Sequence, residues 1–189
     1  GSLFVKTKNK TFSKILQSDK SNNDLLMKQI LDFLDKNKIK FEDISKIFVN
    51  QGPGNFSGLR GSLAIAKGIS LSKNLELFGY NTFLWSCCKF LNKQNSICSL
   101  IKFREKYYIK KFNKKLNSVS NVREIKENEL LTKYAEEVMV VPKNLTQYFN
   151  EKILKLSNLN IVDLNHNELE ILLLNGLLDE KYIKPLYLT

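Results

Sequence analysis

Residues 50–61 read Asn50-Gln51-Gly52-Pro53-Gly54-Asn55-Phe56-Ser57-Gly58-Leu59-Arg60-Gly61. A short apolar run, Ile47 to Val49, precedes this stretch, and a helical pattern follows it to about residue 71. We therefore expect a strand, a glycine-rich turn and a helix N-terminus, a layout that can bind anions. The candidate anion-binding residues are Gly52, Gly54, Ser57 and Arg60, and Ser57 is also the expected cap of the helix.

The glycine-rich turn fits neither of two common phosphate-binding patterns. No Gly-Lys-Ser/Thr ends it, as a Walker loop requires, and Ser57 stands where the GxGxxG pattern has its third glycine. The other interpretation is a tight corner between strand and helix that binds nothing. The residues alone leave both interpretations open.

The helix expected after the turn has one face that is almost bare backbone. Glycine inside a helix costs about 1 kcal/mol relative to alanine, so several glycines on one face need a compensating close contact. That contact is either with this chain's own sheet or with a helix of another chain. The helix expected at 23–37 is a candidate to pack beside the glycine-bearing helix. The candidate partner-binding residues are Leu26, Ile30, Phe33, Ser57, Gly58, Gly61, Ala64, Ile65 and Gly68.

The rest of the chain alternates between strand-like and helix-like hydrophobic patterns, which predicts an α/β fold. We expect a strand hairpin at the N-terminus, from residues 3–8 and 11–17. We place the boundary between an N-terminal lobe, 1–85, and a C-terminal lobe, 86–189, close to a predicted helix at 81–92. Further strands are expected at 75–80, 96–102, 106–113, 118–124, 137–141 and 160–163, and further helices at 127–135, 143–149 and 166–178.

Composition excludes several classes of protein. With 189 residues, 43% hydrophobic and 26% charged, the chain is long enough for one large domain or two lobes and is not disordered throughout. No apolar run approaches the ~20 residues that a membrane span needs. The three cysteines include no CxxC pair, so we expect a reduced, cytoplasmic protein. The single histidine, His166, is expected at the surface or at a helix start, so we expect no metal site and no cofactor.

The net charge of +11 comes almost entirely from lysine, since only Arg60, Arg104 and Arg123 are arginines. Proteins that read bases lean on arginine, so this excess is more typical of a compositional bias. The densest basic stretch, 102–115, alternates with aromatic residues and predicts a half-buried strand with a solvated face. Docking of RNA through this stretch is the alternative.

Several segments together resemble one known family. Gly52-Pro53-Gly54-Asn55-Phe56-Ser57-Gly58-Leu59-Arg60 and the following Leu63-Ala64-Ile65-Ala66-Lys67-Gly68 resemble the GPGSFTGLR…AxAKG signature of the bacterial TsaB (YeaZ) family. Leu77 to Asn81 and the tail from Pro185 to Leu188 are also similar to that family. The resemblance is dense over residues 40–80 and diffuse between there and the tail.

The resemblance implies an actin-like/RNase H-like (ASKHA) two-lobed fold, with mixed sheets flanked by helices. It implies a non-catalytic subunit in the synthesis of tRNA N6-threonylcarbamoyladenosine. The implied partners are a TsaD-like transferase, which it would activate, and a TsaE-like ATPase, with a homodimer when the chain is alone and a tRNA contact through the complex.

Two departures from the family pattern qualify these expectations. Family members open with a strand and an Asp-Thr turn, and this sequence starts at what should be the second strand, so we expect the first strand to be missing. The paired metal histidines of TsaD are also absent. An alternative function is a nucleotide-binding ATPase or a kinase-like enzyme of the same superfamily, with Asp163 as its carboxylate candidate.

Overall fold

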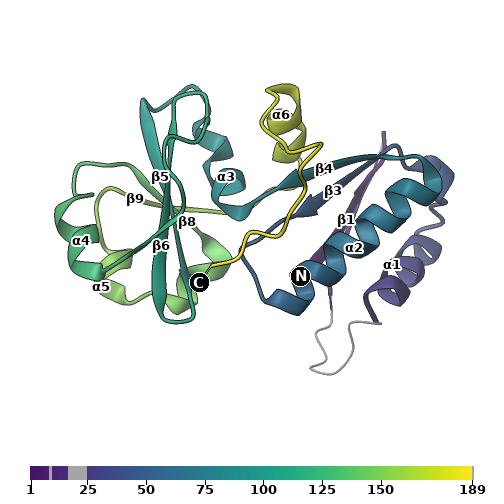
Figure 1. The fold of residues 1–189 in the computed structure, drawn as a ribbon, viewed down its shortest axis with the longest axis horizontal. Helices are drawn as coiled ribbons and strands as arrows, with labels where there is room; N and C mark the ends of the chain where they lie inside the picture. Colours follow the sequence, from purple (N-terminus) through teal and green to yellow (C-terminus); the bar gives the residue numbers. More distant parts are fainter. Residues whose placement is uncertain (9, 17–24, 189) are drawn as a thin grey trace. The chain divides into compact units, whose positions relative to one another are not determined.

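A computed structural model of the chain describes residues 1–8, 10–16 and 25–188 (Figure 1). The chain divides into two compact units, of which the first comprises Gly1–Gly79 together with Asp179–Pro185. The second comprises Tyr80–Leu178 and the last residues from Leu186 onward. From the sequence we expect the boundary after residue 85, with the whole tail in the second lobe. In the structure the first unit ends at Gly79 and also takes in Asp179–Pro185.

The first unit opens with the hairpin expected from the sequence. Strands β1 (Ser2–Lys6) and β2 (Thr11–Ile15) pair antiparallel, with Ser2 opposite Ile15. After helix α1 (Leu25–Lys36) and the 3-10 turn η1 (Phe41–Asp43), strand β3 (Lys46–Asn50) leads into helix α2 (Phe56–Lys73) and strand β4 (Glu76–Tyr80). Strands β3 and β4 are hydrogen-bonded neighbours, and α2 joins them.

Helix α2 packs through one apolar face onto the core of the first unit. Its buried residues Leu59, Leu63 and Ala66 recur at helical spacing, and α2 lies in contact with β3 and α1. The core cluster combines Leu63 and Ala66 with Val49 of β3 and with Ile183 from the tail. The end of the chain is therefore part of the packing that positions α2.

Two further contacts hold the tail in the first unit. Gly79 and Asp179 exchange backbone hydrogen bonds of 2.7 and 2.9 Å, and the Gln51 side chain donates to the carbonyl of Lys184 at 3.1 Å. A Cβ atom at Gly79 would lie 2.7 Å from Gln51 Oε1 and 3.1 Å from Ile183 Cγ2. Only glycine leaves room for this close approach.

The second unit is built on a five-stranded sheet in the order β7-β6-β5-β8-β9. Strands β5 (Ser96–Phe103) and β6 (Lys106–Asn113) are antiparallel, whereas β8 (Met139–Pro142) pairs parallel with both β5 and β9 (Leu159–Val162). The edge strand β7 (Arg123–Ile125) is shorter than the predicted strand at 118–124.

Helices cover both faces of this sheet (Figure 1). On one face, Cys98, Leu100 and Met139 join a core with residues of α4 (Glu127–Thr132), the 3-10 segment η3 (Lys143–Tyr148) and α5 (Glu151–Leu154). On the other, α3 (Thr82–Cys87) contacts β5, β8 and α6 (Glu168–Leu174), and η2 (Cys88–Phe90) contacts α6. The expected α-helix at 143–149 is wrong in type, because the segment takes 3-10 geometry after Pro142.

None of the helices in the described ranges combines the length and the apolar character that a membrane span needs. All three cysteines are buried and unpaired, and burial raises the pKa of each thiol. Cys87 and Cys88 lie in the core of the second unit, as the sequence predicts.

The role of the tail in the first unit is testable at Ile183. Ile183 is 5% exposed among core residues, whereas its neighbour Tyr182 is 75% exposed. Because burial of an Ile side chain removes apolar surface from water, Ile183→Ala should lower the free energy of unfolding by about 2–4 kcal/mol. Tyr182→Ala should change it by less than about 0.5 kcal/mol. Urea denaturation of both variants measures the difference, and equal stabilities would show that the tail does not pack as described.

Candidate functional site

The glycine-rich corner is closed by its own asparagines. The Asn55 side-chain oxygen accepts the Gly58 amide at 2.7 Å and caps α2, while Asn50 Oδ1 accepts the Gly52 amide at 2.9 Å. The expectation that Ser57 caps the helix is wrong, since Ser57 is the second helical residue and is exposed. Asparagine two residues before Ser57 is itself a preferred cap, so the signal was present in the sequence.

Two candidate anion-binding residues are therefore less available to an anion than the sequence suggests. Gly52 is buried, with φ at 120°, a region that favours glycine, and its amide is already bonded to Asn50. The Arg60 guanidinium lies 3.8 Å above the centre of the Phe56 ring. A phosphate at this corner would compete with bonds that the chain makes to itself.

The small-residue stripe of α2 lies on the side of the helix that faces away from its core. Gly61 is two positions from both Leu59 and Leu63, and Gly68 is two positions from Ala66. Two residues correspond to about 200° of rotation, so the glycines and the buried leucines lie on nearly opposite faces. Among the described residues, no atom outside the helix backbone lies within 4 Å of a Cβ built at Gly61 or at Gly68.

The structure extends this open face with apolar side chains that the sequence analysis did not single out. Ala64 and Ser57 are exposed along the stripe, and Ile65 is half-buried at its margin. Leu71, one helical turn beyond Gly68, is 84% exposed, and Phe56 at the helix start is 49% exposed. We call Ser57, Gly61, Ala64, Gly68 and Leu71 the open face of α2. Leu71 was detectable in principle, as an apolar residue seven positions after Ala64.

Helix α1 contributes less to this face than expected. Phe33 is only 5% exposed, and Leu26 and Ile30 are half-buried within the chain. These three residues follow helical spacing, so they form the inward stripe of α1, which contacts α2. Leu31, on another side of α1, is 45% exposed.

The other candidate residues do not gather into a catalytic arrangement. Asp163 is exposed and lies 3.5 Å from Lys143 Nζ, in an ion pair. His166 lies two positions before α6, near the expected helix start, but it is half-buried, with its ring tilted against Trp85 at a centroid distance of 4.9 Å. Burial lowers the pKa of His166 below its usual 6.5. Within the described residues, no group of three or more His, Cys, Asp or Glu side chains could hold a metal ion.

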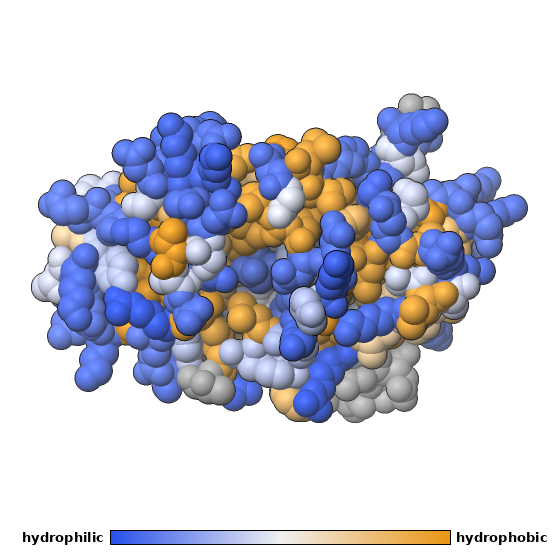
Figure 2. Space-filling model, turned by 45° about the horizontal axis from the view of Figure 1, so that its top comes forward, coloured by the Kyte–Doolittle hydropathy of each residue, from blue (hydrophilic) through white to orange (hydrophobic). Residues whose placement is uncertain are grey.

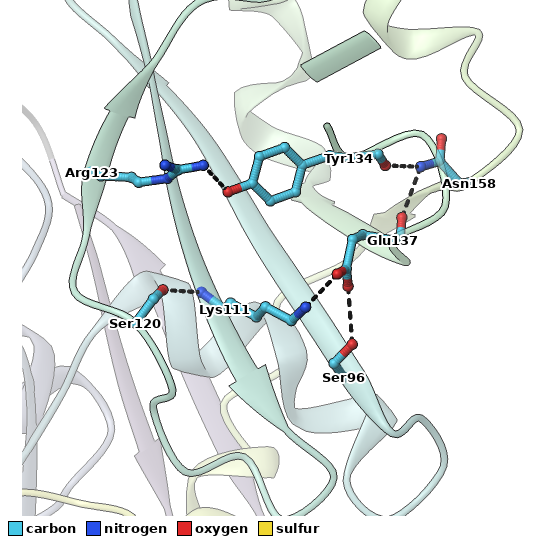
Figure 3. A network of polar contacts seen from close by, with 7 residues as sticks. All are labelled: Ser96, Lys111, Ser120, Arg123, Tyr134, Glu137 and Asn158. Atoms are coloured by element: carbon cyan, nitrogen blue, oxygen red, sulfur yellow. Dashed lines mark hydrogen bonds and ion pairs between the residues drawn. The ribbon is translucent and has the colours of Figure 1, made fainter. Parts of the chain in front are cut away.

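A polar network in the second unit neutralises part of the basic stretch (Figure 3). Glu137 forms an ion pair with Lys111 and accepts a hydrogen bond from Ser96 at 2.9 Å. Asn158 donates to the carbonyls of Tyr134 and Glu137, at 2.8 and 2.7 Å, and Arg123 donates to the Tyr134 hydroxyl. These contacts tie the sheet edge to the segment before β8.

Comparisons with known proteins agree with this fold. A family model described as TsaD, tRNA N6-adenosine threonylcarbamoyltransferase, matches residues 17–138, more than half of the chain. A curated protein of Buchnera aphidicola subsp. Baizongia pistaciae, "tRNA threonylcarbamoyladenosine biosynthesis protein TsaB", is 42% identical over 62 residues. A protein of the same name from Buchnera aphidicola subsp. Schizaphis graminum is 40% identical over 45 residues. These matches cover 32% and 24% of this chain and only 28% and 21% of those relatives.

Two solved structures from Pseudomonas aeruginosa resemble the whole chain. One is titled as an uncharacterized protein with similarity to peptidase YeaZ, with a TM-score of 0.68 at 14% identity. It is covered over 94% of its length and covers 100% of this chain. The other, YeaZ, has a TM-score of 0.66 at 13% identity and covers 98% of this chain, with 94% of its own length matched. They confirm the actin-like/RNase H-like fold expected from the sequence.

The cap assignment can be tested by two substitutions at the start of α2. Asn55→Ala removes the acceptor of the Gly58 amide and should lower the free energy of unfolding by about 1 kcal/mol. Ser57→Ala, two positions later on an exposed site, should leave it within about 0.5 kcal/mol of the unmodified chain. Thermal denaturation distinguishes the two, and a larger loss in the Ser57 variant would reverse the assignment.

The Glu137 network predicts a pH dependence of stability. Hydrogen bonding by Lys111 holds the pKa of Glu137 below its usual 4.5. A carboxyl whose pKa is lowered by folding stabilises the fold above its unfolded pKa, and this contribution is lost as the pH falls through the folded pKa. Glu137→Gln should therefore be less stable than the unmodified chain at pH 7, by a margin that shrinks at pH 3. Urea denaturation at both pH values measures it, with the exposed Glu136→Gln as the control.

Proposed function

The chain belongs to the TsaB/YeaZ family and to the wider TsaD family whose model it matches, and from this premise we propose that it works in tRNA threonylcarbamoyladenosine biosynthesis. Its role is that of a non-catalytic subunit, which pairs with a TsaD-like transferase and activates it. A TsaE-like ATPase joins the pair. The pathway comes from the names of relatives that this chain matches over less than a third of their length, and the partners come from the family resemblance.

The open face of α2 is the observation that carries the proposal. A helix approaches another helix most closely where its side chains are smallest, because the contact residues set the distance between the axes. Gly61 and Gly68 destabilise the isolated helix, and no packing on the described residues compensates for that cost. A partner helix seated on the stripe would provide the compensating contact. The exposed apolar side chain of Leu71 would then be buried against the same partner.

Charge favours a different protein as this partner over a second copy. Helix α2 has no acidic residue, and Arg60 and Lys67 lie at the margin of the open face, whereas Lys73 lies on the other side and pairs with Glu42 at 3.5 Å. Two such helices facing one another would bring like charges together, which disfavours pairing. A partner helix with acidic residues beside its own contact stripe would match α2. A homodimer of the free chain stays a prediction from the family resemblance.

A catalytic nucleotide-binding role has less support. The Gly52 and Gly58 amides, which a bound phosphate would need, are hydrogen-bonded to asparagine side chains. The carboxylate candidate Asp163 is exposed and paired with Lys143. The residues of the corner thus stabilise a turn and a helix start, which is what a scaffold requires.

Substitutions in the open face should separate partner binding from folding. A Cβ atom at Gly61 or Gly68 would have no described atom outside the helix backbone within 4 Å, so Gly61→Leu and Gly68→Leu should both fold, with a melting temperature at least as high as that of the unmodified chain. Each should abolish co-elution with the transferase of the same organism in size-exclusion chromatography, because leucine keeps the helices apart. Gly61→Ala and Gly68→Ala should have smaller effects on co-elution.

A matched control adds leucine to another exposed helical position. Asn128→Leu lies in α4 of the second unit and should leave co-elution unchanged. If folded Gly61→Leu and Gly68→Leu variants still co-elute, the open face is not the contact and the proposed docking is wrong. If the unmodified chain itself fails to co-elute, the proposed function is wrong.

A further inference from the structure

Two lysine-bearing loops lie side by side at one end of the sheet in the second unit (Figure 1). Ser96 at the start of β5 pairs with Asn113 at the end of β6, so the loop before β5 and the loop after β6 share this end. A backbone hydrogen bond of 2.9 Å from the Asn92 amide to the Lys114 carbonyl joins them. Lys93 is thereby brought close to Lys114 and Lys115.

The loop after β6 is built so that its lysines point outward. Asn113 Oδ1 accepts the amides of Lys115 and Asn117, both at 3.0 Å, which folds residues 113–117 into a tight turn. Leu116, with φ at 60°, anchors the turn in the core and is only 2% exposed. The two residues before it, Lys114 and Lys115, are both exposed.

These lysines differ from those of the neighbouring strands in lacking acidic partners. Lys102, Lys106 and Lys111 form ion pairs with Glu105, Glu124 and Glu137. By contrast, residues 88–96 and 112–122 contain no aspartate or glutamate. Among the residues that the structure describes, Lys93, Lys114 and Lys115 have no carboxylate in salt-bridge distance. Hydrophilic side chains gather over this end of the sheet in the space-filling view (Figure 2).

We propose that Lys93, Lys114 and Lys115 form a lysine cluster that binds the phosphate backbone of tRNA. Lysine is a compact point charge suited to phosphate, and backbone contacts position an RNA without reading its bases. The lack of arginine in the cluster agrees with this kind of contact. The choice of tRNA rests on the proposed function, whereas the cluster itself rests on the geometry of the two loops. Within the expected RNA-docking stretch 102–115 the cluster keeps only Lys114 and Lys115, and it adds Lys93 from the neighbouring loop.

Two triple variants with the same change in net charge test the lysine cluster. Lys93→Gln, Lys114→Gln and Lys115→Gln together remove the cluster. Lys143→Gln, Lys152→Gln and Lys155→Gln remove three exposed lysines of the same unit that lie 3.5, 4.0 and 2.8 Å from carboxylates. Binding of the full chain to unmodified tRNA is measured by fluorescence anisotropy across salt concentrations, after thermal denaturation has shown that both variants fold.

The cluster variant should bind tRNA at least about tenfold more weakly at low salt, and the slope of log K against log salt should fall by roughly 3. The paired-lysine control should change the slope by less than about 1, and Lys93→Gln alone should lower it by about 1. Equal losses in both triple variants would show a general effect of net charge and overturn the proposal. Failure of the unmodified chain to bind tRNA at low salt would also overturn it.

Measuring co-elution with the transferase beside tRNA binding separates this proposal from the proposed function. The cluster variant should co-elute with the transferase like the unmodified chain, while Gly61→Leu should lose co-elution and retain tRNA binding. If the cluster variant instead loses the transferase and retains tRNA, the cluster is a protein contact and the RNA proposal is wrong. Loss of co-elution by the unmodified chain, with tRNA binding still sensitive to the cluster, would contradict only the proposed function.

Discussion

The packing of α2 on the core of the first unit is the constraint on which the candidate site depends. Leu59, Leu63 and Ala66 fix the rotation of the helix about its axis, and Asn55 fixes where the helix begins. With these two features set, helical geometry alone places the glycine stripe on the outer side. A rotation of the helix by half a turn would bury the stripe against β3 and expose the leucines.

The returning tail connects this packing to the far end of the sequence. Ile183 enters the same core cluster as Leu63 and Ala66, and Gly79 admits Gln51 and Ile183 because it has no side chain. The first unit is therefore completed by Asp179–Pro185, a segment that follows the second unit's sheet in the sequence. This arrangement explains why the unit boundary cannot be drawn as a single cut through the chain.

The lysine content of the chain has two different structural outcomes. In strand β6, Lys106 and Lys111 form ion pairs with glutamates of neighbouring segments, and the network around Glu137 stabilises the sheet edge. At the end of the sheet, the turn anchored by Leu116 presents lysines with no acidic residue nearby in sequence. Surface ion pairs add little stability each, so the main consequence of the pairing is which positive charges remain open to an anionic partner.

The α/β class, the order of most elements and the family can be predicted from local residue patterns, because the Gly-Pro-Gly corner and the helix after it carry strong local signals. The sequence also predicted the bare helix face, since helical spacing is a local property. Whether that face lies inward or outward was decided by the tertiary structure, because it depends on which side of α2 meets β3 and Ile183. Tertiary packing also decided the place of Phe33: helical spacing made it a candidate for partner binding, but in the fold it is buried. The proximity of Lys93 to Lys114 likewise arises from the register of two strands. Contacts between residues far apart in sequence have no local signal, so only the folded chain reveals them.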